Sequence, residues 1–288
     1  MNLLTSFLLG IIQGLTEFIP VSSTAHLLIG QTLLGIPWDN ATFSFLVLVQ
    51  LGTMISLIVY FWKELWEILR AMFSPVSYQK PHDTEKEDNE AYKKRKRSTA
   101  NAKLGWCILI ATIPALLAGY FLKGDVEALF RQPLLEAAIR LFAAAILMVL
   151  AEWVGKRSRR LRSITWLDAL VIGLFQVLAV FPGASRSGTT ISGGMLRGFH
   201  RRSAARFAFL MSVPVMLAAG GYKMFDVLKM PELTSFLLPM AVGFVSAGVI
   251  GWFVVKWLLG YLTRHSLYPF AAYCAVVGAI CLALSRLL

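Results

Sequence analysis

Charged residues are scarce in this sequence and almost absent from its long apolar stretches. Only 15% of the 288 residues are charged, whereas 57% are hydrophobic and the mean hydropathy is +0.65. This balance excludes an ordinary soluble domain, which carries about 25% charged residues, and indicates a membrane protein. The apolar stretches that are long enough to span a bilayer, at about 20 residues, are residues 41–62, 104–122, 134–154, 203–222, 236–258 and 267–285.

Cysteine is also rare, and its pattern excludes two kinds of site. The three cysteines, Cys107, Cys274 and Cys281, all lie in apolar stretches. An odd count without metal-type spacing argues against a disulfide framework and against a zinc site. We therefore interpret the three thiols as small side chains of the hydrophobic core.

Two further features are missing. The N-terminal apolar stretch lacks the basic segment of a secretory signal peptide and carries Glu17 and Pro20 where cleavage would occur, so we expect no cleaved signal. The net charge of +12 does not indicate nucleic-acid binding, because the basic residues lie in loops between apolar stretches. The expected surrounding is the lipid bilayer, with no nucleic acid as partner.

An internal repeat is the most informative feature that the sequence contains. Residues 10–28 and 173–191 follow one pattern at an offset of 163 positions: an apolar helix, a proline, a short serine-rich turn and a new helix. The matching pairs are Gly10 and Gly173, Gln13 and Gln176, Leu15 and Leu178, Phe18 and Phe181, and Ser22 and Ser185. Broken helices at corresponding places in two halves of a membrane chain indicate its binding site.

The repeat predicts the organisation of the whole chain. We expect one all-α, polytopic integral membrane domain made of two halves, residues 1–160 and 161–288. Each half begins with a re-entrant broken-helix hairpin, at residues 3–36 and 166–198, and continues with three transmembrane helices. Because three spans is an odd number, the second half enters the membrane from the opposite side, and the halves form an inverted repeat.

Basic residues favour one orientation. The loops 63–103, 155–165, 197–206 and 256–264 share one face and hold most of the 28 Lys and Arg residues. The positive-inside rule makes that face cytoplasmic and both termini periplasmic. Residues 74–101 carry an acidic block and then a basic run, which indicates a solvated, disordered linker or a segment resting on anionic lipid headgroups, without a catalytic role.

The first broken helix brings polar side chains to one turn. Gln13 and Glu17 are four residues apart and share a helix face, and Pro20 ends that helix. Ser22 or Ser23 is placed to cap the next helix.

His26 lies on the face of that next helix that carries Ser22 and Ser23, so we expect it to converge with Glu17 deep in the membrane. An ionisable residue at that depth indicates a functional site. The buried carboxylate requires a cation, a proton or a metal as its counterpart. The alternative is that Glu17 pairs with His26 or Arg186 only to hold the bundle together.

The second broken helix has the features of an anion site. Pro182-Gly183 interrupts it, and Arg186 follows among hydroxyl side chains at Ser185, Ser187, Thr189 and Thr190. A new helix N-terminus offers free N–H groups and a positive dipole end, and a guanidinium fits phosphate oxygens. Facing turns would suit a diphosphate on a long apolar tail, although binding without hydrolysis would show the same features.

Both turns resemble the signature motifs of the undecaprenyl-diphosphate phosphatase family, also called the bacitracin-resistance proteins. The first motif, Glu or Gln, three residues, Glu, and then Pro-x-Ser-Ser-Thr-x-His, stands at residues 13–17 and 20–26. The second, Pro-Gly-x-Ser-Arg-Ser-x-x-Thr, stands at residues 182–190. The chain departs from the family in Gln13, where many relatives have Glu, and in Ala25, where Gly is common.

The resemblance implies a hydrolase of the bacterial inner membrane whose site opens to the periplasm. Such an enzyme removes the terminal phosphate of undecaprenyl diphosphate and returns the monophosphate carrier to cell-wall synthesis, which confers bacitracin resistance. A divalent cation, magnesium or calcium, is expected with it.

For the mechanism we hypothesise one role for each matching residue. Arg186 stabilises the transferring phosphoryl group, and Glu17, helped by Gln13, binds the cation. His26 is a general base or the nucleophile, and Ser23 is a nucleophile activated by His26 or a phosphate-binding hydroxyl, with water as a third candidate. The residues assigned to substrate binding are Ser22, Ser185, Ser187 and Thr190.

Two other functions compete with hydrolysis. A transporter or flippase of a polyprenyl phosphate would share the inverted repeat and the broken helices but would leave its substrate intact. A phosphatase of the phosphatidic-acid type is disfavoured, because its Lys-x6-Arg-Pro motif does not occur. Gly193-Gly194 and Gly220-Gly221 would allow close helix packing, within one chain or between the chains of a homodimer.

Overall fold

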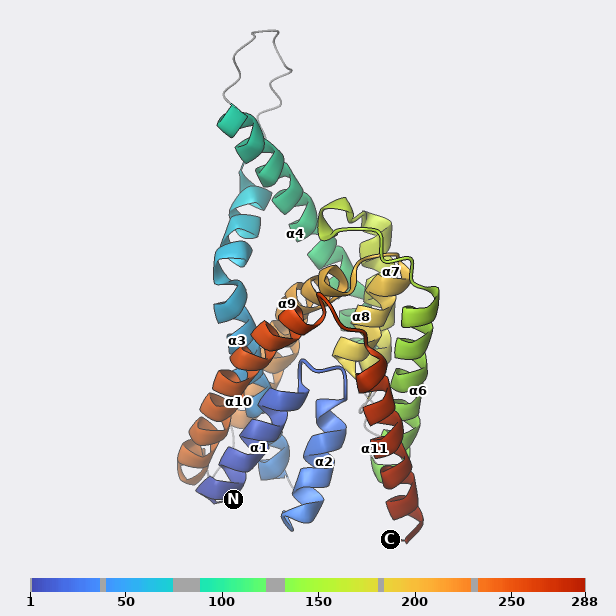
Figure 1. The fold of residues 1–288 in the computed structure, drawn as a ribbon. Coiled ribbons are helices and arrows are strands. Elements are labelled where there is room, and N and C mark those ends of the chain that lie inside the picture. Colours follow the sequence, from blue (N-terminus) through green and yellow to red (C-terminus); the bar gives the residue numbers. More distant parts are fainter. Residues whose placement is uncertain are drawn as a thin grey trace.

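The structure, a computed structural model, describes residues 2–36, 40–74, 89–122, 133–180, 184–228 and 233–287. In this part of the chain the fold is all-α, as predicted (Figure 1). The α-helices are α1 (Leu3–Thr16), α2 (Ser23–Leu33), α3 (Asn40–Phe73), α4 (Asn89–Phe121), α6 (Pro133–Val154), α7 (Trp166–Val177), α8 (Arg186–Leu196), α9 (Arg201–Leu228), α10 (Leu233–Tyr261) and α11 (Tyr268–Leu287). The short 3-10 turns are η1 (Leu161–Ser163) and η2 (Leu178–Val180).

Six of the described helices are long and apolar enough to cross a membrane, and each overlaps a stretch predicted from the sequence. The chain is therefore a multi-pass membrane protein. The apolar helices α1 and α7 have only 14 and 12 residues. At about 1.5 Å per residue they reach about 20 Å, which is short of a hydrocarbon core about 30 Å thick. The candidate spans are Ser44–Phe73, Tyr92–Phe121, Leu134–Val154, Arg201–Gly221, Leu237–Tyr261 and Tyr268–Arg286.

The polar segment that we predicted to be disordered is partly helical. Both α3 and α4 continue into residues 63–103, and the described residues from 89 onward belong to α4. Arg97 of α4 donates hydrogen bonds of 2.7 and 2.8 Å to the carboxylate of Glu67 on α3. Lys, Arg and Ala favour helices, and a helix that is already formed in a membrane span extends without a new nucleus. Composition alone therefore misled the prediction for residues 89–101.

The helices α1 and α2 form an antiparallel hairpin whose turn, residues 17–22, lies deep inside the bundle. Figure 1 shows the outer ends of both helices on the side of the molecule where the two chain termini lie. A Cβ atom added to Gly30 of α2 would lie 2.9 Å from Cδ1 of Ile12 on α1, so the two helices pack closely.

The helices α7 and α8 form the second hairpin. A capping box of Thr165 and Asp168 begins α7, and a Cβ atom on Gly193 of α8 would lie 2.8 Å from the ring of Phe175 on α7. The predicted interruption at Pro182-Gly183 lies outside the described residues. Ser185 then caps α8.

Repeat-related glycines attach the two hairpins to the bundle. A Cβ atom on Gly10 of α1 would lie 2.5 Å from the carbonyl oxygen of Gly243 on α10. In the same way, a Cβ atom on Gly173 of α7 would lie 2.5 Å from the carbonyl oxygen of Ala111 on α4. Only small residues allow such close approach of two helix backbones. Each hairpin therefore packs against a helix of the other half of the chain.

Aromatic packing fixes the turn of the first hairpin against the core. Phe18 is 2% exposed and meets Phe209 of α9 edge to face, with ring centroids 5.5 Å apart. The three cysteines are buried and unpaired, which confirms their predicted place in the core.

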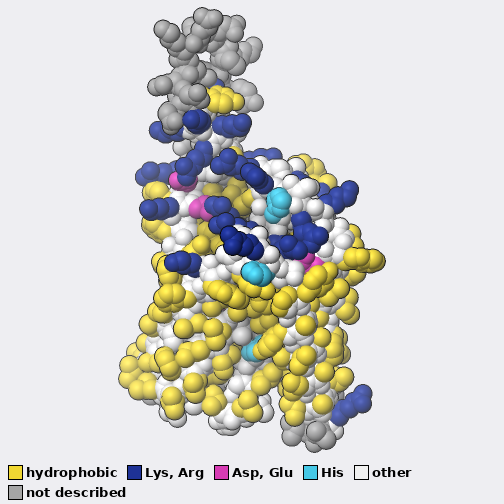
Figure 2. All heavy atoms as spheres, viewed as in Figure 1, with side chains coloured by type: hydrophobic (Ala, Val, Ile, Leu, Met, Phe, Trp, Pro, Cys, Tyr) yellow, Lys and Arg dark blue, Asp and Glu magenta, His cyan; other side chains and the backbone are white. Residues whose placement is uncertain are grey.

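Lys and Arg side chains gather at one end of the molecule, above a broad hydrophobic belt (Figure 2). Two fully buried carboxylates tie this end together. Glu152 of α6 accepts hydrogen bonds from Arg157, Arg201 and the backbone amide of Leu267. It thereby joins the end of α6 to the segments where α9 and α11 begin.

Asp168 is the second buried carboxylate, and it accepts from Arg159 on the preceding loop and from Arg197 at the end of α8. Burial opposes its ionisation, but hydrogen bonds from Arg159, Thr165 and Arg197 outweigh burial and hold the pKa of the Asp168 carboxyl well below its usual range. The same carboxylate raises the pKa of the Arg159 guanidinium. This network holds the start of α7, the end of α8 and the preceding loop together.

Candidate active site

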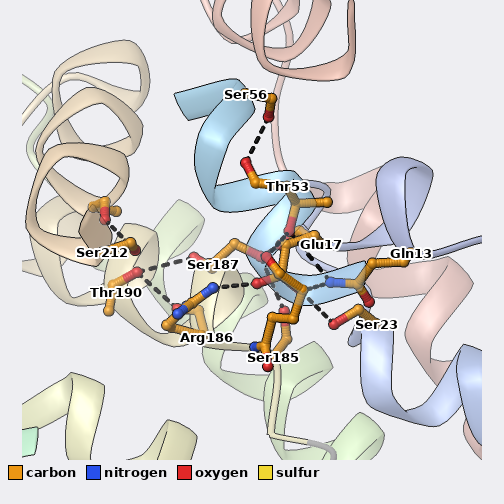
Figure 3. Close-up of polar contacts among 12 residues, drawn as sticks. Gln13, Glu17, Ser23, Thr53, Ser56, Ser185, Arg186, Ser187, Thr190 and Ser212 are labelled. Carbon is orange, nitrogen blue, oxygen red and sulfur yellow. Dashed lines mark hydrogen bonds and ion pairs between the residues drawn. The ribbon is translucent and has the colours of Figure 1, made fainter. Parts of the chain in front are cut away.

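Glu17 lies where the two hairpins meet. It follows α1 as its C-cap residue, and its side chain is 4% exposed. Its Oε2 atom accepts hydrogen bonds from Gln13 Nε2 at 2.8 Å and from Ser23 Oγ at 2.7 Å. Its Oε1 atom pairs with the guanidinium of Arg186 (Figure 3). One carboxylate therefore connects α1, α2 and α8.

Arg186 is the first residue of α8, so its ion pair brings the turn of one hairpin to the start of the other. Its side chain is 18% exposed, against 4% for Glu17. The guanidinium is therefore the more accessible partner for a ligand. The sequence left open whether Glu17 and Arg186 bind a ligand or form an ion pair, and the structure shows the pair. Removing one partner of a buried ion pair is strongly destabilising, because it leaves the other charge without a counterpart.

Serine hydroxyls at the start of α8 stabilise the contact between the two hairpins. Ser185 Oγ accepts from the backbone amide of Gly188 at 3.1 Å and lies 3.3 Å from Ser187 Oγ. Ser187 Oγ donates to the carbonyl oxygen of Ile19, in the turn of the first hairpin, at 3.2 Å. Two of the hydroxyls predicted to bind substrate thus support the helix start and join the turns.

Thr190 was also predicted to bind substrate, and it is 1% exposed. Its Oγ1 atom donates to the carbonyl oxygen of Arg186 at 2.7 Å, and Thr189 donates to the same oxygen at 3.0 Å. In this structure the two threonines fix the helical turn that carries the guanidinium.

Ser22 adopts a backbone conformation that is unusual for a residue with a side chain. Its φ angle is +69° and ψ is +94°, and it is the N-cap of α2. A residue in such a sparsely populated region costs about 1–3 kcal/mol and is frequent at functional sites. Its Oγ atom accepts from the backbone amide of Ala25 at 3.4 Å. The strained cap sets the direction in which Ser23 leaves the turn.

Both ring nitrogens of His26 have partners other than Glu17. Nδ1 lies 2.8 Å from the carbonyl oxygen of Ser22, and Nε2 lies 2.7 Å from the hydroxyl of Tyr273 on α11. The predicted activation of Ser23 by His26 therefore differs from the structure, in which the Ser23 hydroxyl donates to Glu17.

Sequence reasoning missed two polar neighbours of the site. Tyr273 lies 247 positions from His26, in an apolar stretch that matches no motif. Thr53 of α3 receives a weak hydrogen bond of 3.4 Å from Gln13 Nε2. A polar side chain inside a predicted span was the only signal for either residue, and it does not identify a partner.

The first residues of two helices, Ser23 of α2 and Arg186 of α8, contact the Glu17 carboxylate. Ser22 and Ser185 cap α2 and α8 at repeat-related positions. The first amides of these helices, at residues 23–24 and 186–187, have no acceptor within their own helix. Two positive dipole ends together with one guanidinium make a site for an anion with several oxygens, such as phosphate.

Comparison with known proteins connects this geometry to a family. The chain matches the family described as Bacitracin resistance protein BacA over residues 6–280. It is 37% identical to an undecaprenyl-diphosphatase of Chloroherpeton thalassium, an alignment that covers 99% of this chain and 97% of that protein. The undecaprenyl-diphosphatase of Anaeromyxobacter dehalogenans is 39% identical, over 99% of this chain and 92% of that protein. The one from Chlorobium phaeobacteroides is 35% identical, over 96% and 95%.

Proposed function

Because the chain belongs to the bacitracin resistance protein family BacA, we propose that it hydrolyses undecaprenyl diphosphate to undecaprenyl phosphate and inorganic phosphate. The observation that carries this proposal is the contact of Glu17 with both Ser23 and Arg186, between two helix N-termini. The product returns to cell-wall synthesis as its lipid carrier. Removal of the diphosphate, which bacitracin sequesters, makes the cell resistant.

Arg186 holds the terminal phosphate of the substrate. During phosphoryl transfer, charge spreads over the three equatorial oxygens, and the planar guanidinium matches two of them. The N-termini of α2 and α8 add amide donors and dipoles aimed at the same charge. The hydroxyls of Ser185 and Ser187 keep the start of α8 in the orientation that this contact requires.

Ser23 is the nucleophile, and Glu17 is its base. The hydroxyl proton of Ser23 passes to Glu17 Oε2, to which it already donates at 2.7 Å, while Oγ attacks the terminal phosphorus. The bond from that phosphorus to the bridging oxygen breaks, and undecaprenyl phosphate leaves with the electron pair. Glu17 then gives the proton to the departing phosphate.

Water completes the reaction. It attacks the phosphorus of the phosphoserine, and Glu17 accepts a proton from the water and delivers it to Ser23 Oγ as inorganic phosphate departs. His26 takes no proton in this scheme. It holds the carbonyl oxygen of Ser22 and so supports the strained turn that presents Ser23.

A divalent cation fits the oxygen donors of this site. The Glu17 carboxylate and the amide oxygen of Gln13 are ligands of the type that magnesium and calcium prefer. The described residues contain no cluster of three or more His, Cys, Asp and Glu side chains that would hold a metal alone. Glu17 and Gln13 would therefore hold the cation together with the substrate's phosphates, where it would neutralise charge on the phosphate oxygens.

The chain is an inverted repeat of residues 1–160 and 161–288, with re-entrant hairpins at 3–36 and 166–198. This proposal is supported by the short lengths of α1 and α7 and by the equivalent packing of Gly10 and Gly173. The basic end of the molecule faces the cytoplasm under the positive-inside rule, and the loops 155–165 and 197–206 belong to it. The site opens toward the periplasm of the inner membrane, on the side of the two termini.

A homodimer is a further proposal, supported by Gly221 alone among the glycines considered for helix packing. Added Cβ atoms on Gly193, Gly194 and Gly220 would meet Phe175, Ala204 and Leu51 of the same chain, whereas nothing lies within 4 Å of one on Gly221. Small residues on an open helix face allow a second helix to approach in lipid.

Phosphate release by the purified protein in detergent tests the proposed function. We expect inorganic phosphate from undecaprenyl diphosphate, and less of it after addition of a chelator. Arg186→Lys should lower turnover by about two orders of magnitude, because an ammonium keeps the charge but loses the planar fork. Arg286→Lys, at the exposed end of α11, is the matched control and should behave as wild type.

Detergent removes the two sides of the membrane, so hydrolysis persists in this assay and transport does not. A wild-type protein that releases no phosphate, yet moves intact lipid phosphate across sealed vesicles, would favour the transporter and end the hydrolase proposal. Equal turnover of Arg186→Lys and wild type would remove Arg186 from the mechanism.

A further inference from the structure

Tyr273 is a polar side chain in an otherwise apolar part of α11, and it is 45% exposed. Its hydroxyl lies 2.7 Å from Nε2 of His26, and its ring stacks on the imidazole with centroids 5.5 Å apart and planes 10° from parallel. The mechanism given above assigns it no part. Among the described residues, it nevertheless makes the only side-chain hydrogen bond between α11 and α2.

The two contacts of His26 fix its tautomer. The carbonyl oxygen of Ser22 can only accept, so Nδ1 carries the proton and donates to it. A neutral imidazole then has a lone pair on Nε2, which accepts from the hydroxyl of Tyr273. The second contact of a histidine ring commonly decides which nitrogen is protonated.

A chain of contacts runs from Tyr273 to the nucleophile. Tyr273 donates to His26, His26 donates to the carbonyl oxygen of Ser22, and Ser22 caps the helix at whose first position Ser23 stands. The backbone of Ser22 is strained, with a φ angle of +69°, and a strained turn persists only where its surroundings hold it.

The neighbouring residue of α11 supports the same turn. Cys274 is fully buried, and its Sγ atom lies 3.5 Å from the carbonyl oxygen of Pro20. Two consecutive residues of α11 thus reach two carbonyl oxygens of one turn, Cys274 directly and Tyr273 through His26. Through these contacts α11 supports the turn of the first hairpin, residues 17–22.

We infer that Tyr273 is a positioning residue for the hydrolysis of undecaprenyl diphosphate, acting through His26 and Ser22 to hold Ser23 in the orientation for attack. The inference rests on the proposed function. It predicts an effect on the chemical step more than on substrate binding, because in the described part of the chain Tyr273 bonds to His26 and to neither Arg186 nor Glu17.

Tyr273→Phe tests the inference, since it keeps the stacked ring and removes only the hydroxyl. We expect kcat to fall about fivefold to tenfold, the size of effect that one lost hydrogen bond produces, while KM changes less than about twofold. Tyr268→Phe on the same helix is the matched control, because Tyr268 is 48% exposed and lies at the start of α11. Its kcat and KM should equal those of wild type.

The hydrogen bond that Nε2 of His26 accepts gives a second readout that a loss of packing would not move. Nitrogen NMR of protein labelled at histidine, with the His26 signals identified by their loss in His26→Gln, should show the proton on Nδ1 in wild type and in Tyr268→Phe. In Tyr273→Phe the proton should stay on Nδ1, because the carbonyl oxygen of Ser22 remains, and the Nε2 signal alone should shift, because Nε2 loses its hydrogen-bond donor.

The two measurements separate this inference from the proposed function. An active wild type with unchanged kcat in Tyr273→Phe overturns the inference and leaves the hydrolase intact. A fall in kcat with an unchanged Nε2 signal of His26 also overturns it, since the effect would then not pass through His26. If wild type releases no phosphate, the hydrolase fails, and an unchanged Nε2 signal of His26 in Tyr273→Phe then removes Tyr273 as a partner of His26 as well.

Discussion

Glu17 and Arg186 are 169 positions apart in the chain, and their side chains form an ion pair at the junction of two helical hairpins. Because the carboxylate is buried and the guanidinium is partly exposed, the pair presents its positive member to a ligand. The same carboxylate accepts a hydrogen bond from the hydroxyl of Ser23. In the proposed mechanism, phosphate binding and activation of the nucleophile thus both depend on the Glu17 carboxylate.

The ion pair should behave as a unit when it is mutated. Glu17→Gln and Arg186→Ala should each lower kcat by about two to three orders of magnitude, which is typical for loss of a charge that stabilises the transition state. The double variant should be little worse than either single variant, because residues that act together are not additive. Steady-state phosphate release measures this, and multiplication of the two single effects would show that the residues act independently.

Ser23 should carry the phosphoryl group during turnover. After brief incubation with substrate labelled in its terminal phosphate and rapid denaturation, label should remain on wild type and on Ser163→Ala, whose exposed serine is the last residue of the turn η1. Ser23→Ala should retain none and should lose about two or more orders of magnitude in kcat. Wild-type turnover by Ser23→Ala, without labelled protein in any variant, would make water the nucleophile.

Gln13→Glu should make the enzyme more dependent on a divalent cation. The Gln13 amide now donates to Glu17 at 2.8 Å; a carboxylate there would repel Glu17 until a cation lies between them. We expect a lower activity than wild type in chelator and about a tenfold lower magnesium concentration for half-maximal activity. A magnesium titration of phosphate release checks this, and superimposable curves for the variant and wild type would show that position 13 is no cation ligand.

The buried carboxylate at the base of the second hairpin should dominate stability at that end. Asp168→Asn leaves Arg159 and Arg197 without their partner and should cost about 3–5 kcal/mol, seen as a lower melting temperature in detergent. Glu67→Gln is the control, because its pair with Arg97 is exposed and worth about 0–1 kcal/mol.

The acid dependence of stability follows from the lowered pKa of Asp168. A carboxyl whose pKa is lower in the folded than in the unfolded state contributes its full stability above the unfolded value, about 3.9. That contribution is lost as the pH falls below this value toward the folded pKa. Melting temperatures of wild type should therefore drop over this range more steeply than those of Asp168→Asn, and parallel curves would contradict the role of the network.

Much of the fold could be predicted because a long apolar stretch in a membrane protein usually forms a transmembrane helix. The six spans, the all-α class and the buried cysteines required only hydropathy and helix length. The helical segment from residue 89 could not be predicted in this way. Its charged composition indicates solvation, and it does not reveal that Arg97 meets Glu67 on a neighbouring helix.

The residues that meet at the site could be predicted, whereas the hydrogen bonds between them could not. Repeat spacing and the two prolines brought Glu17, Ser23 and Arg186 to one place, since breaks in a membrane helix must be buried. The direction of each hydrogen bond depends on side-chain rotamers and on helices far away in the chain. His26 was named from the sequence as the residue that would activate Ser23, whereas the Ser23 hydroxyl donates to Glu17, and no motif contains Tyr273.

The pairing of Glu17 with Arg186 also shapes the resting state of the protein between turnovers. A lone charge at that depth would draw in water or a counter-ion and distort the surrounding lipid, whereas mutual neutralisation lets the two hairpins stay closed on each other. An incoming ligand must displace the Glu17 carboxylate from the guanidinium of Arg186. A headgroup with two linked phosphates competes for the guanidinium better than the single phosphate that is left after cleavage. The ion pair therefore allows the substrate to bind and favours release of the product.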